Sequence, residues 1–265
     1  MTRSYAKIRL ETTSPAWRVV LNRPEVRNAH DLETFKELVD AFDRAEADRN
    51  CRCIILAAEG PVFCAGQDLT FTRTASGSDR DEYGRWNVAA RQRIQRNYKP
   101  VVAAVNGPAI GGGVYLATAC DLVVAVDTAF FQMGEIYAGN HGGGAHLFSI
   151  GRARSLELAL LGRRISAKTA LEWGLINKCV PAEALSREVD DYVNTLVDLP
   201  PLALRYTKAA ANLQLDMAGF SSLLDAGGAM QRYLGVTPDG YEAKRAFREK
   251  RKPNFSGELP QSPDE

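Results

Sequence analysis

The sequence lacks long apolar runs. Its first 25 residues contain no continuous apolar core of the kind found in signal peptides, and no stretch approaches roughly 18 consecutive apolar residues. We therefore expect neither a secretion signal nor a membrane-spanning helix. The interpretation that follows is a cytoplasmic protein with no membrane partner.

An excess of either charge is also missing. The 33 basic side chains are balanced by 32 acidic ones, which gives a formal net charge of +1 at pH 7. Such a chain has no field strong enough to attract nucleic acid as its main partner. We expect a small-molecule substrate instead.

Disulfide and metal-binding patterns are absent as well. The five cysteines are an odd number, lie inside apolar segments and show no CxxC spacing, which predicts buried, reduced thiols. No spacing brings three His, Asp or Glu side chains together as ligands, so we predict no metal. No separate cofactor is expected either.

What the sequence does contain is a regular alternation of strand-like and helix-like segments. The strand-like ones are short and rich in Val and Ile, with polar or glycine-bearing turns after them, and they cover residues 13–23, 51–59, 99–107, 120–133 and 176–181. Apolar side chains recur at helical intervals in residues 32–49, 153–162 and 166–174. This alternation predicts an α/β fold with mainly parallel strand pairing.

The pattern changes after Pro200, where helix-like segments follow one another without a strand. This change predicts a core domain at residues 1–199 and a C-terminal helical region at residues 200–265. Within the core, the polar stretch TASGSDRDEYG at residues 74–84 predicts a surface loop.

Two glycine-bearing turns follow strand-like segments. The first, at residues 106–113, ends in three consecutive glycines, and the second covers residues 63–69. Glycine lets the backbone come close to a ligand and point N–H groups at it. The two turns could supply the two converging donors of an oxyanion hole. A crowded helix–strand crossing is the alternative for the first turn.

One carboxylate, Glu135, precedes a third glycine cluster at residues 139–144. Little charge lies near it in the sequence, so burial would raise its pKa and suit it to act as an acid or a base. A solvent-exposed glutamate at a helix start is the alternative.

Six segments carry a resemblance to a known family. They are NRPEVRNA at residues 22–29, FCAGQDL, KPVVAAVNGPAIGGG, ACDLVVA, the run LELALLGRRISAKTALEWGLINKCVP, and AFREKRKPNF. In this order, and over nearly the whole chain, they resemble the crotonase superfamily of enoyl-CoA hydratases and isomerases. The resemblance implies a ββα spiral core with a C-terminal helical region, assembled as a homotrimer or a dimer of trimers. It also implies an acyl-CoA substrate, with coenzyme A present only as part of that substrate.

The same resemblance assigns the site residues. The backbone N–H groups of Gln67 and Gly112 would hold the thioester carbonyl as it gains negative charge. Glu135 matches the second of two glutamates in the family's hydratases, but the position of the first is Tyr115 here. Because adding water to a double bond needs two proton-handling groups, this departure argues against ordinary enoyl-CoA hydration. Further substrate contacts are implied at Ala65, Asp68, His141, Gly143, Phe247 and Lys250.

Several activities stay open on this basis. A double-bond isomerase would need only Glu135, to remove a proton and return it. A hydratase-lyase acting on hydroxycinnamoyl-CoA would add tyrosines that bind a phenol, for which Tyr115, Tyr137 and Tyr83 are the candidates. We predict a lyase or isomerase with Glu135 as general acid and base. A crotonase-fold protein that binds without catalysis is a further alternative.

The histidines suggest one more activity. The segment Gly144-Ala145-His146 is similar to one found in β-diketone hydrolases of the superfamily, which implies C–C bond hydrolysis with His146 as a catalytic residue and His141 nearby. His30 precedes the helix-like segment at residues 32–49, and we interpret it as a capping or packing residue.

Overall fold

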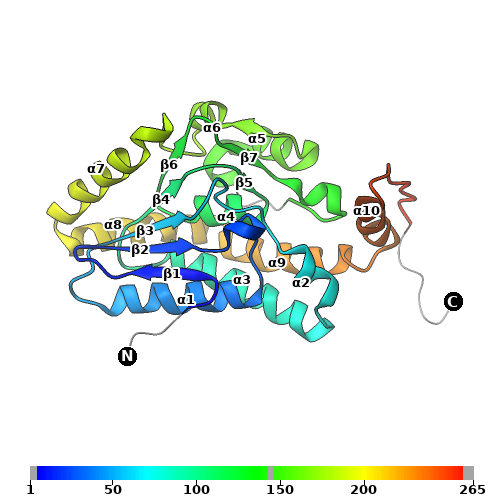
Figure 1. The fold of residues 1–265 in the computed structure, drawn as a ribbon, viewed down its shortest axis with the longest axis horizontal. Coiled ribbons are helices and arrows are strands. Elements are labelled where there is room, and N and C mark those ends of the chain that lie inside the picture. The colour runs from blue at the N-terminus through cyan, green and yellow to red at the C-terminus, as the bar shows by residue number, and fades with distance from the viewer. Residues whose placement is uncertain (1–4, 143–145, 259–265) are drawn as a thin grey trace.

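A computed structural model describes residues 5–142 and 146–258 (Figure 1). Its main sheet has six strands in the order β1-β2-β3-β4-β6-β9, and only the β1–β2 pair is antiparallel. These strands are β1 Ile8–Glu11, β2 Ala16–Leu21, β3 Cys53–Ala58, β4 Val101–Val105, β6 Leu122–Val126 and β9 Lys178–Val180. The mainly parallel α/β fold expected from the sequence is confirmed.

A second, smaller sheet carries the order β5-β7-β8. Its strands are β5 Ala109–Ile110, β7 Phe130–Gln132 and β8 Ile165–Ser166. In two successive stretches of chain, a strand of the large sheet is followed by a strand of the small one: β4 by β5, and β6 by β7. The expected single strand at residues 120–133 is therefore two strands, because a turn after β6 carries the chain from one sheet to the other.

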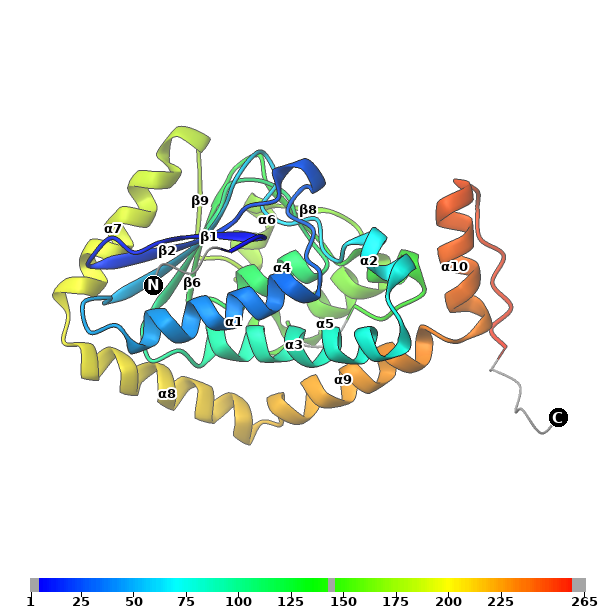
Figure 2. The same ribbon diagram turned by 60° about the horizontal axis from the view of Figure 1, so that its bottom comes forward.

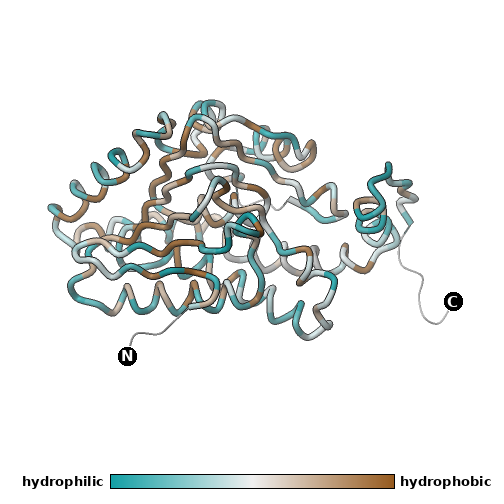
Figure 3. Tube along the Cα trace, in the orientation of Figure 1, coloured by the Kyte–Doolittle hydropathy of each residue, from teal (hydrophilic) through white to brown (hydrophobic). Residues whose placement is uncertain are grey.

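Helices cover both faces of the large sheet (Figures 1 and 2). On one face the alternate residues Ile54, Leu56 and Val101 join the main core with the helices α1 Leu32–Ala47, α3 Gly77–Gln95 and α4 Gly112–Thr118. On the other face Ile55 and Val102 pack against α7 Leu185–Asp198. Strands covered on both faces must be apolar throughout, and Figure 3 shows hydrophobic segments gathered in the central strands.

The remaining helices lie around this core. They are η1 Pro24–Val26, α2 Leu69–Thr74, η2 Gly134–Ala138, α5 Leu147–Leu161, α6 Ala167–Trp173, η3 Ala182–Ala184, α8 Pro201–Met217, α9 Phe220–Leu234 and α10 Pro238–Glu249. The expected loop at residues 74–84 is wrong, because α3 begins at Gly77. Ser76 caps this helix in a reciprocal capping box with Asp79.

The chain after Pro200 is helical, as expected, and α8 is tied to the core by polar contacts. The Lys208 Nζ donates to the Asp121 carboxylate at 2.7 Å, and the Asn212 amide donates to the Gln95 carbonyl at 2.9 Å. The division at residues 199 and 200 stays a prediction. None of the helices in the described ranges is long and apolar enough to cross a bilayer.

Candidate active site

The two glycine-bearing turns lie against each other. Cys64 and Ala109 form a parallel bridge, in which the Ile110 N–H donates to the Cys64 carbonyl at 2.9 Å and the Cys64 N–H donates to the Pro108 carbonyl at 3.2 Å. A Cβ at Gly113 would lie 2.4 Å from the Cys64 carbonyl oxygen. Only glycine allows this approach.

The two turns joined by the bridge carry two backbone N–H groups without an acceptor among the described residues. Neither the Gln67 N–H nor the Gly112 N–H donates a hydrogen bond within the described part of the chain. Gly66, with φ of 90°, brings the turns together so that a Cβ on it would lie 3.7 Å from the Gly112 nitrogen. Unpaired N–H groups on a preset backbone are suited to stabilise developing negative charge on a carbonyl oxygen.

Asn28 fixes the segment that enters this site. Its backbone is left-handed, with φ of 54°, and its buried side chain makes three hydrogen bonds to backbone groups. The side-chain oxygen accepts from the Arg23 N–H at 2.8 Å, and the amide donates to the Glu59 and Val62 carbonyls at 2.8 and 2.7 Å. Asparagine combines tolerance of this conformation with donors and an acceptor, which aspartate or leucine would lack in part.

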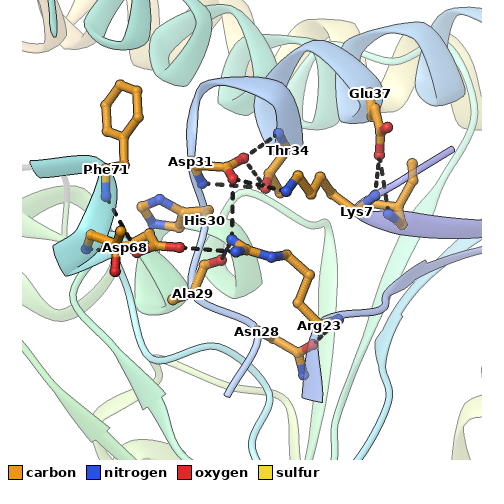
Figure 4. A network of polar contacts seen from close by, with 12 residues as sticks. Lys7, Arg23, Asn28, Ala29, His30, Asp31, Thr34, Glu37, Asp68 and Phe71 are labelled. Atoms are coloured by element: carbon orange, nitrogen blue, oxygen red, sulfur yellow. Dashed lines mark hydrogen bonds and ion pairs between the residues drawn. The ribbon is translucent and has the colours of Figure 1, made fainter. Parts of the chain in front are cut away.

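A charged network holds the same segment to the second turn (Figure 4). The Arg23 guanidinium donates to the Asp68 carboxylate at 2.9 Å and lies 3.2 Å from the Asp31 carboxylate. Asp31 caps α1, and Asp68 caps α2 by accepting from the Thr70 N–H at 2.8 Å. The predicted substrate contact Asp68 is thus already engaged in capping and ion pairing.

In Figure 4 His30 lies beside Asp68, in the segment between Asn28 and Asp31. Its ring is buried, its centroid is 4.6 Å from that of Phe35, and its Nδ1 lies 3.0 Å from the Tyr83 hydroxyl. The Nε2 has no hydrogen-bond partner, and a Cβ on Gly112 would lie 2.0 Å from it. His30 packs against its neighbours as expected, but packing does not explain its free Nε2. The residue that caps α1 is Asp31 and not His30.

Glu135 approaches the same turn from η2. Its Oε1 lies where a Cβ on Gly111 would be only 2.9 Å away, and its Oε2 is buried without a hydrogen-bond partner. Burial raises the pKa of Glu135 to about 7, while a hydrogen bond from its own backbone and the charge of Arg91 oppose that rise. A carboxyl group with this pKa can both accept and donate a proton near neutral pH.

Arg91, Tyr115 and His146 form a stack, and the charge of Glu135 reaches Arg91 and Tyr115. The Arg91 guanidinium lies 4.9 Å from the centre of the Tyr115 ring, which in turn stacks on His146 at 5.1 Å between ring centroids. The Tyr115 hydroxyl donates to the Gly142 carbonyl. The Nε of Arg91 and the Nε2 of His146 are both buried without a hydrogen-bond partner among the residues that the structure describes.

Burial decides the charges in this cluster. It lowers the pKa of His30 to about 4, and burial followed by the charge of Arg91 lowers that of His146 to about 4, so both rings are neutral at pH 7. Burial also raises the pKa of the Tyr115 hydroxyl. Arg91 keeps its charge, although burial lowers its pKa too.

Arg91 is partly buried, and its neighbours replace little of the hydration that it loses. Its stack on Tyr115 contributes about 0.5–2 kcal/mol, which does not fully replace the hydration lost by an enclosed charge without an ion-pair partner. Polar groups left unpaired inside a protein are uncommon. Several of them gathered around one pair of free amides mark this cluster as the candidate active site.

The other expected contacts are more scattered. Ala65, in the second turn, donates its N–H to the Arg27 carbonyl at 3.0 Å. The His141 Nε2 lies 2.7 Å from the Gly227 carbonyl of α9. Phe247 is exposed on α10, and Lys250 ends that helix. Gly143 lies outside the described residues. Each of these substrate contacts stays a prediction.

Arg91, and the pairing of Tyr83 with His30, were missed by sequence reasoning. Arg91 and Tyr83 both lie on α3, and the sequence predicted a loop for the first turns of this helix. The capping box at Ser76 was the available signal. As for metals, no group of three or more His, Cys, Asp or Glu side chains suited to one is found in the described part of the chain.

Comparisons with known proteins identify relatives of this arrangement. A sequence model of the enoyl-CoA hydratase/isomerase family matches residues 12–258. An enoyl-CoA hydratase from Mycobacterium avium subsp. paratuberculosis K-10 superposes with a TM-score of 0.85 at 29% identity, over 96% of this chain and 100% of the other. A carnitinyl-CoA hydratase from Mycobacterium avium superposes with a TM-score of 0.86 at 28% identity, over 96% of this chain and 100% of the other. An enoyl-CoA hydratase/isomerase from Xanthobacter autotrophicus Py2 superposes with a TM-score of 0.83 at 30% identity, over 95% of this chain and 100% of the other. The crotonase-like fold with a C-terminal helical region is confirmed.

Replacing Glu135 by Gln is expected to stabilise the fold more as the pH rises. The native carboxyl, with a pKa of about 7, keeps a proton that the unfolded chain releases above about pH 4.5. Stability is therefore lost between these two values, by on the order of 2–3 kcal/mol at about pH 8. Urea unfolding of the wild type and the variant across this pH range measures the loss of stability. A difference between them that does not change with pH would contradict the raised pKa.

Replacing Gly112 by Ala is expected to destabilise the fold through His30, because the new Cβ would lie 2.0 Å from the Nε2. The cost should be about 2–3 kcal/mol in the wild type and under about 1 kcal/mol in a His30→Ala background, measured by urea unfolding. Gly113→Ala is the control, since its new Cβ would meet the Cys64 carbonyl and should cost the same in both backgrounds. Equal costs for Gly112→Ala in the two backgrounds would contradict the placement of His30.

Proposed function

The chain belongs to the enoyl-CoA hydratase/isomerase family, and on that premise we propose that it transfers a proton on an acyl-CoA thioester through an enolate intermediate. The thioester oxygen would accept from the N–H groups of Gln67 and Gly112. Glu135 would act as the single catalytic carboxylate. The observation that carries the proposal is Glu135, whose Oε2 is enclosed and whose pKa is raised to about 7, against the turn that presents the Gly112 N–H.

The proposed roles divide the chemistry simply. As the proton leaves the α-carbon, charge moves to the thioester oxygen, where two preset donors in a dry site stabilise it by several kcal/mol. Glu135 takes the proton in its ionised form. Because its pKa lies near neutral pH, it can return the proton without a large energetic barrier.

The absence of a second glutamate favours isomerisation over hydration. Tyr115 stands at the position of that glutamate, and its hydroxyl already donates to the Gly142 carbonyl. Moving a double bond requires one base that removes a proton at C2 and delivers it at C4. Glu135 alone fulfils this requirement.

A lyase acting on a phenolic acyl group has less support. The three tyrosines considered for a phenol each have a partner: Tyr115 donates to Gly142, Tyr83 pairs with His30, and the exposed Tyr137 donates to the Leu161 carbonyl at 2.8 Å. A phenol would have to displace one of these contacts.

Hydrolysis of a C–C bond in a cyclic β-diketone is the second candidate function. It is favoured by the Nε2 of His146, which is buried and unpaired beside Tyr115 and could accept a proton from water. The low pKa of His146, about 4, weakens it as a base, and the charge of Arg91 disfavours the imidazolium that would form. Glu135 is better matched to proton transfer at neutral pH.

We also propose that the chain assembles as a trimer or a dimer of trimers. Its consecutive helices α8 and α9 expose large apolar side chains to solvent, among them Leu213, Met217, Met230 and Tyr233. In Figure 2 these helices form a continuous arm along one side of the molecule. Apolar residues gathered on such an arm are typical of a subunit interface.

Glu135→Gln is expected to lower turnover of a 3-enoyl-CoA by about 10²–10⁴-fold, because the only base is lost. Wild-type kcat/KM should rise with pH around a midpoint near 7, as Glu135 ionises. Isomerisation leaves the mass unchanged, so the ultraviolet absorbance of the conjugated 2-enoyl thioester measures turnover of the 3-enoyl-CoA. Mass spectrometry measures the products from crotonyl-CoA, feruloyl-CoA and a cyclic β-diketone. Glu172→Gln, at an exposed position on α6, is the matched control.

The same panel separates the two candidate functions. Diketone cleavage that is lost in His146→Ala and kept in Glu135→Gln would replace the isomerase proposal with the hydrolase. Turnover that survives both changes would show that neither residue is catalytic. If thioesters raise the melting temperature without being converted, the protein binds but does not catalyse.

Light scattering in solution is expected to give three or six times the chain mass of 29.0 kDa. Met217→Lys should shift the protein toward smaller species, because a charge would be buried in the contact. Leu160→Lys, at a similarly exposed position on α5, should leave the mass unchanged. A wild-type chain that stays monomeric at high concentration would contradict the proposed assembly.

A further inference from the structure

Arg91 is a partly buried cation with no counter-ion among the described residues. Its guanidinium makes no hydrogen bond or ion pair with any residue that the structure describes, and its Nε is fully buried. Arg23 provides the contrast, since its similarly enclosed side chain pairs with both Asp31 and Asp68. Buried arginines are normally paired in this way. The missing partner of Arg91 therefore calls for an explanation.

The surroundings of Arg91 offer it no negative charge at close range. Tyr115 and His146 stack beside it as neutral rings, and Tyr83 is also neutral. Among the described residues, Glu135 is the one carboxylate that its charge reaches. The two form no ion pair, and the Oε2 of Glu135 has no partner in that part of the chain either. The cluster thus has a place for one further anion.

The thioester itself does not fill that place. In the proposed function its oxygen is held by the amides of Gln67 and Gly112, and its α-carbon faces Glu135. The CoA phosphates are expected near the exposed Phe247 and Lys250 of α10, whereas the Arg91 Nε is buried beside Tyr115. What remains is the acyl part of the substrate beyond the α-carbon.

We propose that Arg91 binds a carboxylate carried by the acyl group, so that the substrates are CoA thioesters of dicarboxylic acids. This inference rests on the proposed function and specifies its substrate class. A planar guanidinium with free donors matches a carboxylate in a two-bond arrangement. The partner is brought by the substrate, which explains why the chain supplies none.

The experiment compares matched pairs of thioesters by calorimetric binding. Succinyl-CoA is paired with butyryl-CoA, glutaryl-CoA with valeryl-CoA, and adipyl-CoA with hexanoyl-CoA, so that each pair differs only in a terminal carboxylate or methyl group. In the wild type, at least one dicarboxylic thioester should bind about tenfold or more tightly than its partner. Titrations with and without sodium acetate test whether a free carboxylate occupies the place instead.

Variants of Arg91 then assign the preference to this side chain. Arg91→Gln should reduce the preference to about twofold or less, and Arg91→Lys should keep part of it because the charge remains. Arg93→Gln, on the same helix but half-exposed and paired with Asp43, should leave it unchanged. Arg91→Gln should not lower the melting temperature, since it removes an unpaired buried charge. If that variant fails to fold, the wild-type ratio and Arg91→Lys decide.

Equal binding within all three pairs, or a preference that persists in Arg91→Gln, would overturn the inference. So would an acetate effect on butyryl-CoA binding without any preference for a dicarboxylic partner. These results leave the proposed function standing as long as acyl-CoA binds and is converted. If no acyl-CoA binds more tightly than free CoA, the proposed function and this inference both fall.

Discussion

The backbone of the turn at residues 63–68 lies directly against that of the turn at residues 106–113, and the rest of the site is arranged around this contact. The Cys64–Ala109 bridge joins the two turns, and a Cβ at Gly113 would lie only 2.4 Å from a backbone oxygen. The N–H groups of Gln67 and Gly112 have no acceptor in the described part of the chain. Glycine at these positions is thus a requirement of backbone geometry, from which the site's capacity to hold an oxyanion follows.

Burial sets the protonation states of the side chains around these turns. The same enclosure that raises the pKa of Glu135 keeps His30 and His146 neutral, because it penalises every charged form. Arg91 cannot escape this penalty by losing its proton. The fold therefore holds Glu135 as a carboxyl group that is partly ionised near neutral pH, and Arg91 as a cation without a paired anion among the described residues. Such groups reduce stability, which is consistent with a site shaped for a ligand.

Much of this could be predicted from the sequence. Alternating apolar segments gave the parallel sheet, because strands covered on both faces must be apolar throughout. Glycine clusters after strands indicated the two turns, and an isolated Glu135 beside them indicated the acid–base group. These features are local in the sequence, so their spacing is visible without a structure.

The helix α3 and its contribution to the site could not be predicted in the same way. Few of its side chains are buried, among them Tyr83, Ala90 and Ile94, so its apolar pattern is weak and its polar first turns resemble a loop. Its role depends on pairings across long sequence separations, such as Tyr83 with His30 and Arg91 with Tyr115. Only the folded chain brings these residues together.

Exchange of the α-protons of saturated acyl-CoA thioesters in D₂O, followed by NMR, tests the central claim most directly, because it reports enolate formation whatever the final reaction is. With butyryl-CoA and glutaryl-CoA, the account predicts exchange at the α-carbon but not at the β-carbon. It also predicts that exchange is lost in Glu135→Gln, while the thioester still binds. Exchange at the wild-type rate in Glu135→Gln, or no exchange by a wild-type protein that binds these thioesters, would contradict it.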